Sequence, residues 1–140
     1  MTSRSRQPFP GPPTIEVSWG EVIDKMTILE IKEQRLASPE AVAHVRRERT
    51  ALTRVLKKLD PPPAELDALT SRLKSVNEAL WTIEDQIRAK EASKSFDRQF
   101  VELARSIYLN NDERSRLKRR INELLGSDLV EEKQYTPYRS

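Results

Sequence analysis

The stretch LDALTSRLKSVNEALWTIEDQI, residues 66–87, carries the most regular hydrophobic pattern in the chain. Its apolar residues alternate at spacings of three and four, at Leu66, Leu69, Leu73, Val76, Leu80, Ile83 and Ile87. A heptad repeat of this kind is typical of a long helix whose apolar seam packs against another helix. At ~1.5 Å per residue the segment predicts a helix roughly 40 Å long. It begins after Asp60-Pro61-Pro62-Pro63 and ends near Glu91.

The segment that follows keeps the same spacing. Its apolar residues are Phe96, Phe100, Leu103, Ile107, Leu117, Ile121 and Leu124. In the middle of this segment the repeat falls on two polar residues, Asn110 and Arg114, which leaves two alternatives. Either one helix of about 30 residues carries a polar layer, or two helices meet at Asn110-Asn111-Asp112, because asparagine and aspartate favour turns. The unbroken phase of the repeat favours one helix, and Gly126 predicts its C-terminal end.

Two further helices are predicted upstream from their capping residues. In SWGEVIDKMTILEIKEQRL, residues 18–36, Ser18 is a predicted N-cap, and Glu21 three positions later completes a capping box. The next helix begins with Ser38-Pro39, since proline is favoured at the first helical position. It ends before the three consecutive prolines, which remove backbone donors and disfavour helical geometry in the residues before them.

These elements predict one all-α domain, an antiparallel bundle of three to four long helices with coiled-coil-like packing. The chain has 140 residues, only 3 of them glycine, and 34% of its residues are charged. Residues 15–37 carry a net charge of −2 and residues 38–60 a net charge of +3, so neighbouring helices attract one another. Residues 15–126 form the bundle in this prediction. Residues 1–14 are a disordered tail rich in proline and arginine, and residues 127–140 are an extended tail docked on the bundle.

Composition argues against several functional classes. The chain has no cysteine and a single histidine, His44, so no metal site is expected. The net charge is +3 and the arginine-rich runs are interspersed with acids, so nucleic acid is not an expected partner. No apolar run reaches the ~18 residues of a membrane span, and no hydrophobic secretory segment follows the first residues. The expectation is a cytoplasmic protein without a membrane contact.

Two glutamates stand among the apolar residues of the 18–36 helix. Glu30 and Glu33 both project into its apolar arc, and this helix is apolar on more than one face, so it is expected to contact several neighbours. Buried carboxylates without partners cost several kcal/mol each, so partners are required. Arg88 is the expected partner, with Trp81 as an aromatic wall. Such contacts serve either to fix helix register or to line a ligand pocket, and both interpretations stay open.

The candidate ligand-binding residues are polar or aromatic and lie on these helix stripes or in the C-terminal tail. They are Lys25, Glu30, Glu33, Asn77, Trp81, Glu84, Arg88, Arg105, Asn111, Asp112, Lys118, Asn122, Glu132, Lys133 and Tyr135. A pocket lined by such side chains suits a small anionic or phosphorylated molecule. Both ligand binding and catalysis predict that Glu30, Glu84, Arg88 and Lys133 converge on one concave, partly open cavity.

The leading functional hypothesis is a binding or interaction module that associates with itself, with a protein partner or with a small anionic ligand. The alternative is a small all-α enzyme acting on a phosphorylated or carboxylated metabolite. Glu30-x-x-Glu33 resembles the acidic helix of all-α nucleoside-triphosphate pyrophosphohydrolases, with Glu84 and Asp85 as further ligands of Mg²⁺. The same helix distantly resembles that of small all-α chorismate mutases. No catalytic residue is assigned and no cofactor is expected, except Mg²⁺ under the pyrophosphohydrolase alternative.

Four blocks of sequence carry a family resemblance. They are VSWGEVIDKMTILEIKEQR, LKSVNEALWTIEDQIR, FVELARSIYLNNDERSRLKRRIN and GSDLVEEKQY. In this order they resemble a bacterial all-helical family, domain of unknown function 6165, over roughly residues 15–138. The resemblance implies a small, stand-alone bacterial protein, but no activity and no catalytic residue. Its polar motif residues overlap the helix stripes above and include Asp24, Lys32, Asp85, Glu131 and most of the candidate set.

Overall fold

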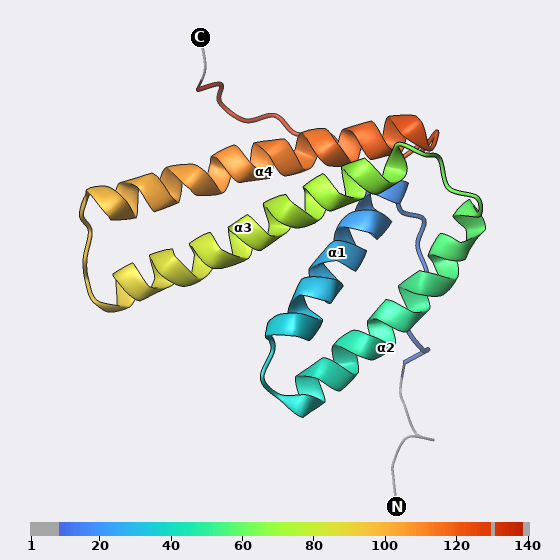
Figure 1. Cartoon of the computed structure of the whole chain (residues 1–140), viewed down its shortest axis with the longest axis horizontal. Helices are drawn as coiled ribbons and strands as arrows, with labels where there is room; N and C mark the ends of the chain where they lie inside the picture. The colour runs from blue at the N-terminus through green and yellow to red at the C-terminus, as the bar shows by residue number, and fades with distance from the viewer. Residues whose placement is uncertain (1–8, 130, 139–140) are drawn as a thin grey trace, which may run out of the picture.

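The computed structural model describes residues 9–129 and 131–138. This part of the chain forms helices and no strand, as Figure 1 shows. The elements are α1 (Trp19–Arg35), α2 (Pro39–Leu56), the short 3-10 helix η2 (Lys57–Leu59), α3 (Leu66–Ala92) and α4 (Arg98–Leu124). The predicted all-α class is therefore confirmed.

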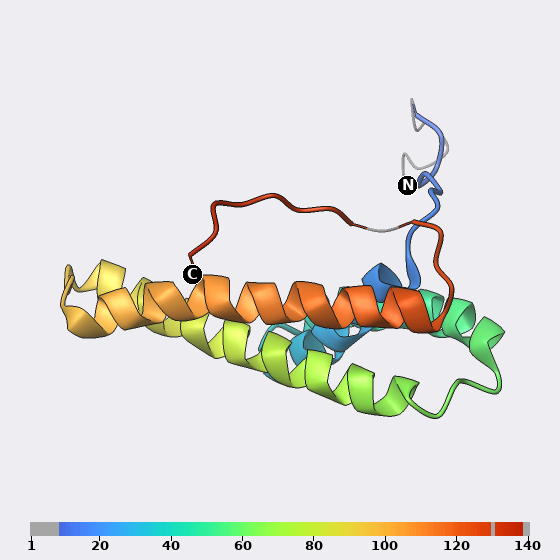
Figure 2. The same cartoon turned by 90° about the horizontal axis from the view of Figure 1, so that it is seen from above.

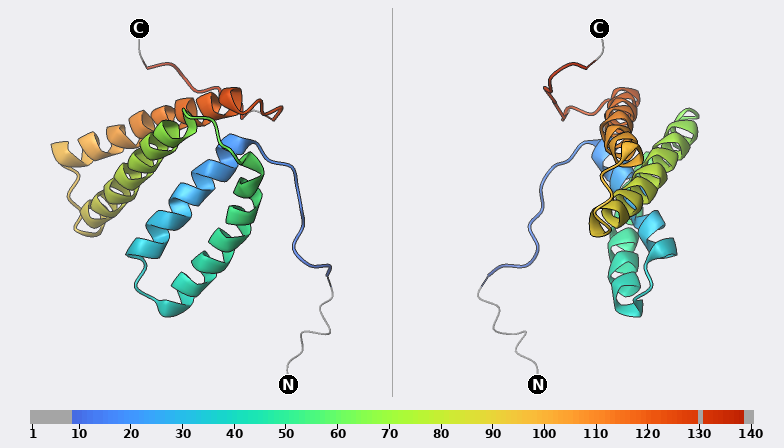
Figure 3. Two further views of the ribbon diagram at one scale, coloured as in Figure 1. Left: turned by 45° about the vertical axis from the view of Figure 1, so that its right-hand side comes forward. Right: turned by 90° about the vertical axis from the view of Figure 1, so that its left-hand side faces the viewer.

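The helices form two hairpins, α1–α2 and α3–α4, and the first packs against one end of the second (Figures 1 and 3). Of the four helices, α1 alone contacts the other three, which fits its apolar residues on more than one face. Helix α2 contacts α1 and η2 but neither α3 nor α4. Three helices thus meet in the bundle, and α2 covers the outer face of α1.

The helix ends follow the capping residues. The Ser18 hydroxyl accepts a hydrogen bond from the Glu21 backbone N–H at 3.2 Å, and the Ser38 hydroxyl accepts one from Ala41 at 3.3 Å. The Glu21 carboxylate pairs with Lys118 of α4 rather than closing the predicted capping box. Beyond α4, Gly126 adopts a φ of 63°, and the next N–H, of Ser127, reaches back to an α4 carbonyl at 2.9 Å.

Helix α4 is one continuous helix of 27 residues, as the unbroken phase of the repeat predicts, and the alternative of two helices meeting at Asn110-Asn111-Asp112 is wrong. The two polar residues on its seam find different partners. The Asn110 side-chain amide donates to the Ser106 carbonyl within the same helix at 2.9 Å. The Arg114 guanidinium leaves α4 and reaches Asp24 of α1. The polar layer is therefore accommodated by a contact with a third helix.

The apolar core lies where α1 crosses the half of the α3–α4 hairpin near η2. Its buried members share this crossing and are Ile23, Leu66, Leu69, Leu73, Leu117 and Ile121. Trp19, Leu56 and Leu59 pack around them and close the end of the core. The heptad seam of α3 thus supplies core residues mainly in its first half.

The two tails differ in their contacts. Residues 9–17 are exposed and form neither helix nor strand, and the rest of the predicted disordered segment, residues 1–8, lies outside the described residues. The C-terminal tail leaves the end of α4 and runs back along it (Figure 2). Glu131 pairs with Lys118, and Tyr138 contacts Tyr108, which precedes Lys118 by ten positions in α4. In the described part of the chain, no helix has the length and hydropathy needed to cross a membrane.

Candidate functional site

The most deeply buried carboxylate of α1 is that of Asp24, whose residue is 3% exposed. The Arg114 guanidinium binds it in a two-pronged contact, with Nε 3.0 Å from Oδ1 and Nη2 2.5 Å from Oδ2. The Asn77 side-chain amide donates to Oδ1 at 2.9 Å and to the Thr27 hydroxyl at 2.9 Å. The hydrogen bond to Asp24 raises the pKa of Arg114 further, so the Arg114 guanidinium stays positively charged.

This cluster joins α1, α3 and α4 and fixes how they meet. Every fully buried side-chain nitrogen or oxygen among the described residues has a hydrogen-bond partner, so no fully buried polar atom of the cluster is left unpaired. Asn77, a candidate residue, therefore has a structural role here. Sequence reasoning missed Asp24 and Arg114 as candidates, although Arg114 interrupting the apolar repeat was a visible signal.

Glu30 and Glu33 are held by α2, and the prediction that Arg88 pairs with them is wrong. Arg49 binds Glu33 at 2.8 Å and Glu30 at 3.4 Å, and Arg46 adds a contact to Glu33 at 3.2 Å. The hydrogen bond from Arg49, followed by that from Arg46, lowers the pKa of Glu33. The two side chains are 29% and 22% exposed, so they are half-buried rather than shut away from water.

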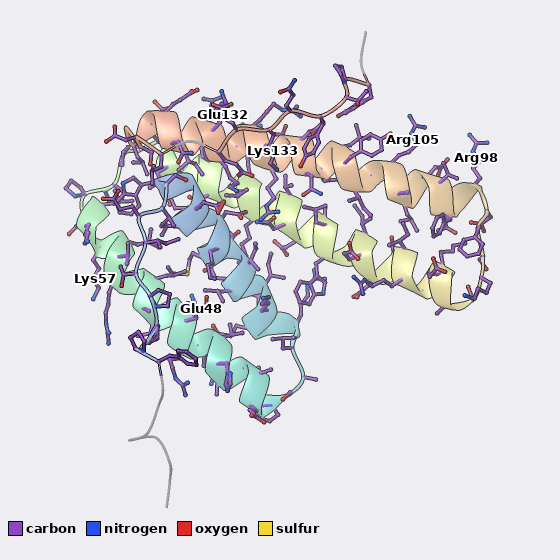
Figure 4. All side chains as sticks on the ribbon, turned by 180° about the vertical axis from the view of Figure 1, so that it is seen from behind. Glu48, Lys57, Arg98, Arg105, Glu132 and Lys133 are labelled. Atoms are coloured by element: carbon purple, nitrogen blue, oxygen red, sulfur yellow. The ribbon has the colours of Figure 1, made fainter. Side chains whose placement is uncertain are left out.

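The other candidates on α1, α3 and the first half of α4 do not gather. Lys25 pairs with Glu48 on the outside of the α1–α2 hairpin at 2.7 Å. Arg88 pairs with Glu84 one turn away on α3 at 2.8 Å, with both side chains exposed. Trp81, which precedes Glu84 in α3, is half-buried. Arg105 is exposed on α4 (Figure 4). The expected convergence of Glu30, Glu84, Arg88 and Lys133 is thus wrong.

The glutamates that the magnesium hypothesis requires also bind arginines instead. Among the described residues, no three histidine, cysteine, aspartate or glutamate side chains come together in a way that suits a metal ion. Glu30 and Glu33 face Arg49 instead, and Glu84 faces Arg88. The geometry on which the pyrophosphohydrolase comparison depends is therefore not formed.

Several C-terminal candidates do come together, in a groove between α4 and the tail. Its volume is about 980 Å³, within the about 300–1,000 Å³ of small-molecule sites. The tail forms one wall, and the middle of α4, residues 107–116, forms the other. Figure 4 shows Glu132 and Lys133 beside α4, with Arg105 and Arg98 farther toward its N-terminal end. Predicted lining residues are Asn111, Asp112, Lys133 and Tyr135, and those missed include Tyr108, Ser115, Arg116 and Tyr138.

A smaller hollow of about 140 Å³ adjoins the groove and shares Ser115, Arg116 and Lys133 with it. The predicted residues Lys118 and Asn122 line this hollow, together with Arg119 and Glu131. Four basic side chains and one acidic side chain thus border it, and each of the basic side chains pairs with a glutamate.

Ion pairs and an aromatic contact hold the tail on α4. Lys118 Nζ lies 2.8 Å from Glu131 and also contacts Glu21 of α1. Arg119 binds Glu132 at 3.2 Å. Farther along, the Tyr138 hydroxyl donates to the Asp112 carboxylate, and the Tyr138 ring packs edge-on against Tyr108 with centroids 5.0 Å apart.

Lys118 is the central anchor of the tail. Burial by itself lowers the pKa of Lys118, but its hydrogen bonds to Glu131 and Glu21 outweigh that effect and raise the pKa overall. The bond to Lys118 lowers the pKa of Glu131. Lys118 therefore stays positively charged and Glu131 negatively charged at neutral pH, which favours the docked tail.

Acid is expected to release the tail. Because the docked pKa of Glu131 lies below its ordinary 4.5, the ion pair contributes fully above about pH 4.5 and is lost as pH falls through the lower docked value. Lys118 and Lys133 are the cations that face Glu131. NMR amide shifts of residues 131–138 measure the release, and Glu131→Gln is the control. An acid step of unchanged size in Glu131→Gln contradicts this assignment.

A comparison with known protein families finds a match over nearly the whole chain. A model of a family of unknown function, DUF6165, matches residues 14–140. The chain belongs to DUF6165. The match spans every helix of this DUF6165 chain and the whole groove, and its limits agree with the predicted resemblance over 15–138. No curated protein and no solved structure matches the chain.

Proposed function

We propose that the protein is a binding module for a small anionic ligand, which it holds in the groove between α4 and the C-terminal tail. The observation that carries the proposal is the lining of this groove. Two cations, Arg116 and Lys133, stand in it beside three tyrosines, Tyr108, Tyr135 and Tyr138. Such a lining suits a ligand that has a carboxylate or phosphate group attached to a flat, largely apolar body.

The tyrosines support the apolar part of this ligand. Aromatic rings offer large apolar faces while their hydroxyl groups reach water or polar partners. Tyr135 is 75% exposed and Tyr138 47% exposed. A ligand that packs against the exposed faces of these rings covers this area, and burial of apolar surface is worth roughly 25 cal/mol per Å².

The cations support the anionic part. Lys133 borders both the groove and the smaller hollow, and its Nζ lies 3.5 Å from Glu131, a longer separation than the 2.8 Å between Lys118 and the same glutamate. Lys133 is therefore the cation of this region whose charge is least committed to a protein partner. We expect it, with Arg116, to bind the anionic group of the ligand.

Calorimetric titration of the full chain at low salt tests the proposal with three probes. Phenyl phosphate carries both an anion and a ring, inorganic phosphate carries only the anion, and phenol only the ring. Phenyl phosphate is expected to bind more tightly than either of the others. Lys133→Ala and Tyr135→Ala are each expected to weaken it about tenfold, which corresponds to about 1.4 kcal/mol.

Lys57→Ala is the matched control, because Lys57 is an exposed lysine at the start of η2 (Figure 4). This variant is expected to bind phenyl phosphate as the original chain does. Equal weakening by Lys57→Ala and Lys133→Ala indicates nonspecific attraction to a basic surface. That result, or no binding of any probe, contradicts the proposal.

A further inference from the structure

The far half of the α3–α4 hairpin projects beyond α1 and α2, as Figures 1 and 2 show. We call this half, residues 78–106, the arm. None of its side chains is fully buried, and all of its residues lie in the described part of the chain. In the near half, by contrast, α1 covers the seam, and Leu73 and Leu117 are 0% and 1% exposed. The arm therefore has the seam of a bundle without the third helix.

The apolar repeat continues through the arm, and near the start of the arm the Arg35 guanidinium of α1 donates to the Thr82 hydroxyl at 3.4 Å. The half-buried apolar residues of its two helices are Ala79, Leu80, Trp81, Ile83, Ile87, Phe100, Leu103 and Ala104. Phe96 and Val101 are 57% and 53% exposed, and Phe96 packs only edge-on against Phe100, with centroids 5.2 Å apart. Two helices bury the one apolar seam that lies between them, but the apolar side chains on either side of this seam stay in contact with water. A four-helix arrangement buries these side chains as well.

The charges of the arm select its partner. The α3 part, residues 78–92, has four acidic and two basic side chains, a net charge of −2. The α4 part, residues 98–106, has two basic and one acidic side chain, a net charge of +1. A two-fold axis that sets α3 of one copy beside α4 of the other brings these opposite charges together. The arm is therefore complementary to itself.

We propose that the arm is the interface between two copies of this chain, which join there as an antiparallel four-helix bundle. The groove begins at Ile107, beyond the arm, so this inference does not depend on the proposed ligand. Each copy supplies an acidic and a basic flank on either side of the apolar seam. The two-fold arrangement then closes with two chains and leaves no further arm free.

Sedimentation equilibrium of the full chain over a wide concentration range tests this inference. The expected mass is twice the chain mass of 16.2 kDa. Val101→Glu is expected to weaken the dimer by about tenfold or more, because it places a charge in the apolar interface. Val101 is half-exposed within its own chain, so circular dichroism of the variant is expected to show unchanged helix content.

Val17→Glu is the matched control, since Val17 is 49% exposed but lies outside the arm. It is expected to leave the dimer intact. A charge exchange gives a second readout: Arg98→Glu with Arg105→Glu weakens the dimer, and adding Glu84→Lys with Asp85→Lys restores it. A monomer at all concentrations, or a dimer that withstands Val101→Glu, overturns the inference. Binding of the arm to lipid vesicles in place of a second copy also overturns it.

Discussion

Replacing Asp24 with alanine is expected to lower the free energy of unfolding by about 3 kcal/mol, because the substitution breaks a buried ion pair. Asp24 is 3% exposed and accepts hydrogen bonds from Arg114 and Asn77. Its loss leaves both donors without their acceptor. The Arg114 side chain is 30% exposed and can regain some water, so the effect is expected near the lower end of the range for buried pairs.

Urea unfolding followed by circular dichroism measures this effect. Glu48→Ala is the control, because it removes an ion pair with Lys25 in which both side chains are about half exposed, at 45% and 56%. Such a pair is worth at most about 1 kcal/mol. If Asp24→Ala costs no more than Glu48→Ala, the cluster does not hold α1, α3 and α4 together in the way described above.

Gly20→Ala is expected to destabilise the protein by about 2 kcal/mol or more, although alanine is the better helix former by ~1 kcal/mol. A Cβ at position 20 comes to 2.6 Å from the Lys118 backbone carbonyl and 2.8 Å from Asn122 Oδ1. The Gly20 N–H also donates to that oxygen at 2.6 Å. Because the carbonyl is backbone, α1 and α4 must move apart, and the helix contact and this hydrogen bond both weaken.

Thermal and urea unfolding of Gly20→Ala measure this cost, with Gly11→Ala as the control. A Cβ added at Gly11 meets no atom within 4 Å, so that substitution is expected to change stability little. Unchanged or increased stability of Gly20→Ala contradicts the close crossing of α1 and α4. Since Lys118 also anchors the tail, the variant is further expected to loosen the tail.

The helices could be predicted from the sequence because their signals are local. Ser18 and Pro39 set helix starts, Gly126 sets a stop, and the unbroken repeat through Asn110 predicts a continuous α4. Which helix packs against a given face depends on residues far apart in the sequence. A helical projection gives the face on which Glu30 lies, but not which helix covers that face, and so Arg49 of α2 was not foreseen as its partner.

The candidate site was predicted in part for the same reason. Asn111, Asp112, Lys133 and Tyr135 belong to polar motif blocks near the C-terminus, and a tail that turns back along α4 brings them together. Tyr138, also missed, lies just beyond those blocks and reaches the groove only because of that turn. Arg116 looked like one more charge on a solvated helix, since its exposure to the groove depends on where the tail lies.

NMR titration of the ¹⁵N-labelled full chain with phenyl phosphate tests most directly whether the space between α4 and the tail is the binding site. Amide shifts are expected to change at residues 107–119 and 131–138, and to change less in Lys133→Ala at the same concentration of phenyl phosphate. Shifts confined to the α1–α2 hairpin or the arm, or no shift at concentrations where the calorimeter detects binding, contradict the assignment of the groove.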